Sequence, residues 1–180
     1  MLRLKKYLFI SFLFPTLLLA QSDITKHPGY VDFGDLSEFE QGDNVTEIFI
    51  EEGLIKMVAN LSKSDDPQLS NMLNDLKLVK VNIFKPDNRA GKDVRSRIEK
   101  IDKELIAKKW ERMVKVRDKN EVVNIYVKTS ASGFEGLAIT TFDPKGEAVF
   151  VNIVGRIDLD KIGKLTEKFN IPSLDKVNQK

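Results

Sequence analysis

Side chains that commonly carry out catalysis are scarce in this 180-residue chain. It contains no cysteine and a single histidine, His27. Without a thiol there is no cysteine nucleophile, and one imidazole cannot build a multi-histidine metal site. Ser132 and Lys128 could act as nucleophile and base only if the lysine were buried, and both fall at a predicted exposed turn. The residue types therefore predict a protein that is not an enzyme and that needs no cofactor and no metal.

Carboxylates are the remaining candidates for chemistry, and they cluster near the N-terminus. Eight acids and no base fall between residues 32 and 52: Asp32, Asp35, Glu38, Glu40, Asp43, Glu47, Glu51 and Glu52. Clustered carboxylates can bind Ca²⁺, but the spacing of a calcium-binding loop is missing, which favours a solvated or self-pairing acidic surface. Because paired carboxylates can also hydrolyse glycosidic bonds, a small secreted hydrolase that uses carboxylates remains an alternative function.

Residues 89–119 are the basic counterpart, with twelve Lys or Arg against six acids. A basic stretch can bind nucleic acid, but the interleaved acids argue against such a partner, as does the export signal that residues 1–20 predict (below). Glu99 with Lys103, and Glu104 with Lys108, have the spacing of ion pairs on a helix surface. The basic stretch could instead meet the acidic segment of a second copy, which would give a homodimer that high salt loosens.

Apolar periodicity and turn residues divide the chain into strands and helices. We expect strands at residues 45–50, 76–84, 112–117, 122–129, 135–142 and 148–157. We expect helices at residues 54–61, 67–75, 92–110 and 158–169. Short segments rich in turn residues join the last four strands, which favours hairpins. The order predicts an α+β fold, with a mostly antiparallel sheet of five to six strands and helices packed on one face.

The predicted strands present two different faces. One is uniformly aliphatic and should form the core: Val79, Val81, Ile83, Val123, Ile125, Val127, Leu137, Ile139, Val149, Val151 and Ile153. The other mixes amides, aromatics and lysines: Lys80, Asn82, Phe84, Asn124, Tyr126, Lys128, Thr140, Phe150 and Asn152. Asparagine is uncommon inside strands, because its side chain competes for local backbone groups.

The mixed face is the candidate binding site, an open platform for a protein or small ligand. The alternatives are an ordinary solvated face, or a face partly covered by residues 30–40. If it is a platform, Asn82→Ala, Asn124→Ala and Tyr126→Ala should abolish partner capture without lowering thermal stability.

Residues 1–20 have the pattern of a signal peptide. Arg3, Lys5 and Lys6 precede an apolar run at residues 8–19, and Ala20 offers a small residue for cleavage. The run is too short to span a bilayer comfortably, so we expect no integral membrane span after cleavage. Gln21 stands where a lipoprotein would have a cysteine, so the chain should not be lipid-anchored. We expect a periplasmic or secreted protein.

The rest of the chain divides simply. Residues 21–29 are predicted to be a flexible tail and residues 30–172 a single α+β domain, followed by a C-terminal tail at 173–180.

Three stretches of the mature chain carry a family resemblance: PGYVDFGDL at 28–36, LKLVKVNIF at 76–84, and VNIVGRIDL at 151–159. Together they resemble domain-of-unknown-function family 4252, over about residues 28–170. The resemblance implies small exported bacterial proteins of this fold, many of them with a lipoprotein cysteine that this chain lacks. It implies no reaction and carries no catalytic motif.

The sequence thus favours an exported, non-catalytic binding or interaction module of the bacterial cell envelope, for example in envelope signalling or assembly. Its partner would be an envelope protein or a small ligand of unknown identity. The carboxylate hydrolase and a structural, self-associating protein are the alternatives.

Overall fold

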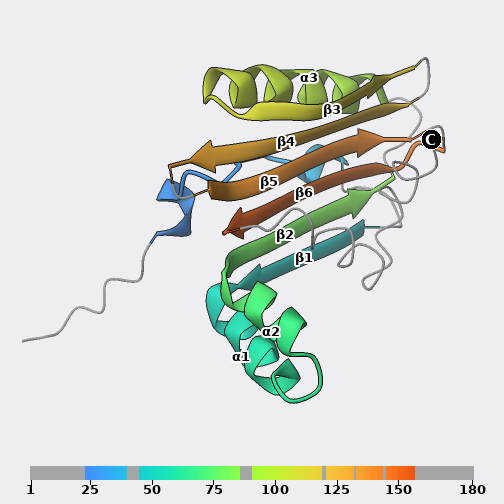
Figure 1. The fold of residues 1–180 in the computed structure, drawn as a ribbon. Helices are drawn as coiled ribbons and strands as arrows, with labels where there is room; N and C mark the ends of the chain where they lie inside the picture. The colour runs from blue at the N-terminus through green and yellow to red at the C-terminus, as the bar shows by residue number, and fades with distance from the viewer. Residues whose placement is uncertain are drawn as a thin grey trace, which may run out of the picture.

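The computed structural model describes residues 23–39, 45–85, 91–118, 121–131, 133–143 and 145–156 (Figure 1). The predicted signal peptide, the helix expected at 158–169 and the tail at 173–180 lie outside the described residues.

The described residues form two short 3₁₀ helices, three α-helices and six strands. They are η1 (Ile24–Lys26), η2 (Ser37–Phe39), β1 (Val45–Glu51), α1 (Glu52–Ser62), α2 (Pro67–Asn74), β2 (Leu76–Phe84), α3 (Gly91–Ala107), β3 (Glu111–Arg117), β4 (Val122–Ser130), β5 (Gly133–Phe142) and β6 (Ala148–Gly155). The strands form one sheet in the order β1-β2-β6-β5-β4-β3. Each strand pairs antiparallel with its neighbours in this order. The predicted α+β class is confirmed.

Local sequence signals explain where the helices begin and end. Asp66 accepts a hydrogen bond from the Leu69 amide at the start of α2, and Pro67 follows as the first helical residue. The end of α3 comes earlier than Trp110, the residue that periodicity suggested. Lys109 adopts a φ of 60°, and the Trp110 amide donates to the Leu105 carbonyl, which is the bond that terminates a helix in a Schellman motif.

The first apolar cluster lies on the face of the sheet that α3 covers. Its members come from α3, from residues 31–39 and from the strands: Val31, Phe33, Leu36, Phe39, Phe84, Val94, Ile98, Ile101, Leu105, Trp110, Tyr126, Ala138, Phe142, Ala148 and Phe150. Phe150 is at its centre, with ring centroids 5.4 Å from Phe33 and 5.6 Å from Phe84. In Figure 1, α3 runs along the β3–β4 side of the sheet, opposite the β1–β2 side where α1 and α2 lie.

A second apolar cluster occupies the other face. It contains most of the aliphatic residues expected in the core, together with Ile55 and Ala59 of α1 and Leu73 of α2. The sheet therefore carries apolar clusters on both faces, with α3 on one and the α1–α2 pair contributing to the other.

Gly155 marks a close approach of two backbone segments at the end of β6. Its φ is +129°, and a Cβ built there would lie 2.4 Å from the Asp75 carbonyl oxygen. The register of β2 against β6 shifts between Leu76 and Leu78, opposite this glycine. Only glycine tolerates both the backbone conformation and the approach.

Candidate functional site

The face predicted to be an open platform is buried. Phe84, Tyr126, Thr140, Phe150 and Asn152 have no exposed surface, and Asn82 and Asn124 retain 3% each. Only Lys80 and Lys128 are half-buried, and Lys128 Nζ donates to the carbonyl of Lys108, 2.6 Å away, at the end of α3.

The prediction of an open face was therefore wrong. Its aromatic residues form an apolar surface that needs its own cover, and α3 with residues 31–39 supplies it. The structure agrees with the alternative in which residues 30–40 cover part of the face, through Val31, Phe33, Leu36 and Phe39.

Asn152 attaches the N-terminal segment to the sheet. Its Oδ1 accepts from the Val31 amide at 2.9 Å, and its Nδ2 donates to the Gly29 carbonyl at 2.9 Å and to the Leu137 carbonyl at 3.1 Å. The amide is thus used by the chain itself, because burial requires hydrogen-bond partners for each polar group. Asn152 therefore holds the N-terminal segment against the sheet and is not a ligand-binding residue.

The other two amides of this face also have internal roles. Asn124 Nδ2 donates to Thr140 Oγ1 at 3.3 Å, and Asn82 Nδ2 donates to Glu47 at 3.4 Å. Among the described residues, Asn82 Oδ1 is buried without a hydrogen-bond partner.

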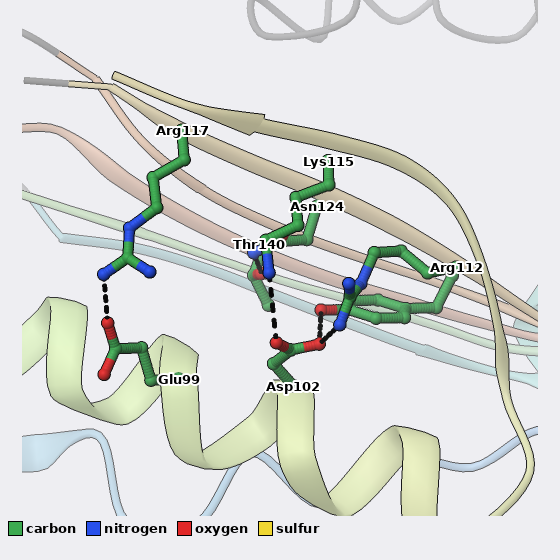
Figure 2. A network of polar contacts seen from close by, with 8 residues as sticks. Glu99, Asp102, Arg112, Lys115, Arg117, Asn124 and Thr140 are labelled. Atoms are coloured by element: carbon green, nitrogen blue, oxygen red, sulfur yellow. Dashed lines mark hydrogen bonds and ion pairs between the residues drawn. The ribbon is translucent and has the colours of Figure 1, made fainter. Parts of the chain in front are cut away.

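A charged network joins α3 to β3 and β4 (Figure 2). Asp102 of α3 accepts hydrogen bonds from Arg112 of β3 and from the Tyr126 hydroxyl of β4, the latter at 2.8 Å. Lys115 Nζ lies 3.7 Å from the same carboxylate, and Arg117 pairs with Glu99 at 2.5 Å. The bulge between Arg112 and Val114 brings Arg112, Lys115 and Arg117 to one face of β3.

The network holds its groups in their ordinary charge states. Burial works to raise the pKa of Asp102, but the hydrogen bonds from Tyr126 and Arg112 outweigh it and the net direction is downward. Burial and the hydrogen bond to Asp102 raise the pKa of the Tyr126 hydroxyl. Neither group is prepared to exchange a proton near neutral pH, and the adjacent hollow of about 50 Å³ is small for an organic ligand. The network serves to anchor α3.

His27 lies in a folded part of the chain. Residues 23–29, predicted as a flexible tail, include η1, and Gly29 is buried against Glu135 and Gly136. His27 Nδ1 accepts from the Gly29 amide at 3.1 Å, so the ring proton is on Nε2, which lies 3.6 Å from the Glu135 carboxylate.

His27 borders a polar pocket of about 250 Å³ at the end of the sheet. Its lining carries both charge signs: His27, Glu52, Asn74, Asp75, Leu76, Lys77, Glu135 and Arg156. Burial lowers the pKa of His27 and outweighs the opposing effect of Glu135, so the ring is neutral at pH 7. Since both ring nitrogens are engaged by the chain, protonation of Nδ1 would break the bond from Gly29.

We expect the free energy of unfolding to fall as the pH is lowered below the ordinary pKa of histidine. The unfolded chain binds the proton near pH 6.5 whereas the folded chain resists it, so this contribution is complete above pH 6.5 and is lost as the pH falls toward the lower folded pKa. For one proton the loss is at most about 1.4 kcal/mol per pH unit.

Urea unfolding of the protein at pH 7.5 and 5.5 measures this loss. The matched control is His27→Asn, whose amide oxygen can still accept from Gly29 but which does not titrate. A pH response of equal size in this variant would contradict the assignment.

Apolar side chains are exposed on the edge formed by β1 and α1. This β1–α1 surface comprises Val45, Ile48, Phe49, Leu54, Met57, Val58 and Leu61, which are 38–73% exposed. The helix expected at 54–61 is present as α1, and its apolar stripe at helical spacing faces outward: Leu54, Met57, Val58 and Leu61. The helix buries Ile55 and Ala59 instead. The sequence signal for this orientation of the helix was the shorter apolar pair, Ile55 and Ala59, on another side of it.

The opposite edge of the sheet, β3, is exposed as well. Met113 and Val116 are 57% and 42% exposed. Within the described ranges, no group of three or more His, Cys, Asp or Glu side chains could hold a metal ion. No described helix is long and apolar enough to span a membrane.

Comparison with known proteins places this fold in a family. No curated protein and no solved structure matches the chain. The family model described as "Domain of unknown function (DUF4252)" matches residues 39–165, more than half of the chain and within the region that carries the resemblance. The chain therefore belongs to the DUF4252 family.

Proposed function

We propose that the protein is an exported, non-catalytic binding module of the bacterial cell envelope. It acts through the exposed edges of its sheet and not through the sheet face, which α3 and residues 31–39 cover.

The β1–α1 surface is the observation that carries this proposal. Seven large apolar side chains in it keep more than a third of their surface in contact with solvent. Exposed apolar side chains gathered on two consecutive elements commonly mark a protein interaction surface. Because β1 is an edge strand with exposed side chains on both faces, it can also offer its backbone to a partner.

The state of the titratable groups supports a role in binding. Asp102 accepts hydrogen bonds from Arg112 and Tyr126, and His27 is held by Gly29 and Glu135. A general acid or base must be able to exchange its proton with a substrate, and these two side chains are committed to the fold.

The sequence of the first twenty residues supports export. Arg3, Lys5 and Lys6 followed by an apolar run and Ala20 are typical of a cleaved secretory signal.

Export and binding can be tested together in a bacterium that expresses the full chain. We expect the protein in the envelope or medium fraction, with a new N-terminus at Gln21. A photo-crosslinking amino acid at Phe49 or Leu61 should give a specific adduct, whereas the same group at Gln68, an exposed polar position of α2, should not. A chain with an intact N-terminus in the cytoplasm would refute export, and equal labelling at Gln68 would refute a dedicated surface.

A further inference from the structure

The two edges of the sheet match each other. β1 and β3 are the terminal strands, each has seven residues, and in the described part of the chain each pairs on one side only. Most side chains of both strands are exposed. Two uncovered edges of equal length can extend one sheet into another.

The charges on the two edges are opposite and lie on the same face. The register places Glu47 and Glu51 of β1, which alternate with Val45 and Phe49, on the same face of the sheet as Phe84 and α3. Arg112, Lys115 and Arg117 of β3 lie on that same face, opposite Tyr126, Asn124 and Val122. Among the described residues these three cations pair with two carboxylates of α3, Asp102 and Glu99, which leaves one positive charge in excess on this face of β3.

The other face of both edges is mostly β-branched. It carries Thr46, Ile48 and Ile50 on β1, and Val114 and Val116 on β3, which pair with aliphatic residues of β2 and β4. Glu111, at the start of β3, lies on this face as well.

We propose that the partner of the β1 edge is the β3 edge of a second copy of this chain, paired antiparallel so that the two sheets become one. This inference rests on the proposed function, in that β1 is the binding surface, and it names the partner. Because the sheet has six strands that alternate in direction, β3 of a neighbour in the same orientation runs antiparallel to β1. The α3 faces of the two copies then lie on the same side.

The register that we propose pairs Glu47 with Lys115, and it places Thr46 opposite Val116 and Ile48 opposite Val114. The symmetric alternatives are disfavoured by charge, because β1 against β1 brings Glu47 and Glu51 together, and β3 against β3 brings three cations together. The contact is therefore head-to-tail, and it leaves a free edge at each end for further copies.

Sedimentation velocity of the protein purified from the full expressed chain tests the association. We expect the average mass to rise with protein concentration and the apparent dissociation constant to increase at least about tenfold between roughly 0.05 and 0.5 M NaCl, because exposed ion pairs are screened. A monomer at every concentration in low salt would overturn the proposal.

Charge exchange identifies the edges. Glu47→Lys alone and Lys115→Glu alone should each weaken association at least about tenfold, because each places like charges opposite one another. Glu47→Lys combined with Lys115→Glu in one chain should restore it, as should a mixture of the two single variants. The matched controls Glu104→Lys and Lys100→Glu change the same charges on exposed positions of α3 and should associate like the unmodified protein.

The outcomes also separate this inference from the proposed function. Association unaffected by either single variant would refute the edge pairing, as would failure of the combined variant to associate while it remains folded by circular dichroism. A monomer that gives a Phe49 adduct with a different envelope protein would leave the binding module intact and remove only the second copy as its partner. Head-to-tail association of a chain that is retained in the cytoplasm would refute export and leave the edge pairing intact.

Discussion

Replacing Asn152 by alanine is expected to lower the free energy of unfolding by about 3–4 kcal/mol, since three buried hydrogen bonds disappear and each contributes roughly 1 kcal/mol or more. The Val31 amide and the Gly29 and Leu137 carbonyls would be left without their side-chain partner. The loss should be concentrated in residues 29–39, because Asn152 links them to β6 and β5. Urea unfolding measures the free energy, and hydrogen exchange at the Val31 amide reports the local release.

Asn124→Ala is the matched control for this prediction. It removes another buried amide from the same face, which among the described residues makes one hydrogen bond, the 3.3 Å contact with Thr140. We expect a cost of about 1 kcal/mol, with protection at Val31 unchanged. Equal effects of the two substitutions would mean that Asn152 does not fasten the segment. Both results differ from those expected of an open platform, where removing these amides would leave stability unchanged.

Replacing Gly136 by alanine is expected to destabilise the fold by about 2–3 kcal/mol through overpacking. The added Cβ would lie 2.5 Å from Gly29 Cα, 2.7 Å from the Gly29 carbonyl oxygen and 2.9 Å from the Trp110 ring. The first two contacts are with backbone atoms, which cannot rotate away. Either the segment that contains Gly29 lifts from β5, or the strand must shift. Thermal unfolding measures the loss.

Gly53→Ala provides the opposite control. A Cβ at Gly53 in α1 has nothing within 4 Å, so alanine should stabilise the protein by about 0.5–1 kcal/mol through the lower entropy of the unfolded chain. If Gly136→Ala were as well tolerated as Gly53→Ala, the close approach of residues 29 and 136 would be contradicted. Because Gly136 and Asn152 act on the same junction, the combined variant should lose less than the two effects added together.

The amino-acid sequence was sufficient to predict the elements and their class. Alternation in LKLVKVNIF predicted β2 with its observed bounds, and Asp66-Pro67 predicted the start of α2. Short turns predicted the antiparallel arrangement of β3 to β6. These signals are local: periodicity, capping and turn residues act within a few positions and do not depend on distant contacts.

The tertiary structure decided which surfaces are covered. Alternation separates the two faces of a strand but does not say what packs on each, and here Phe84, Tyr126 and Phe150 meet residues 31–39 and α3 from distant parts of the chain. The same limit applies to α1, whose larger apolar stripe faces outward because the helix packs at the sheet edge through Ile55 and Ala59. Strand order made β1 and β3 the terminal strands of the sheet that the described residues form, and the register put their opposite charges on a common face. Burial depends on long-range packing, and an apolar or amide side chain has the same local pattern whether a partner segment covers it or not.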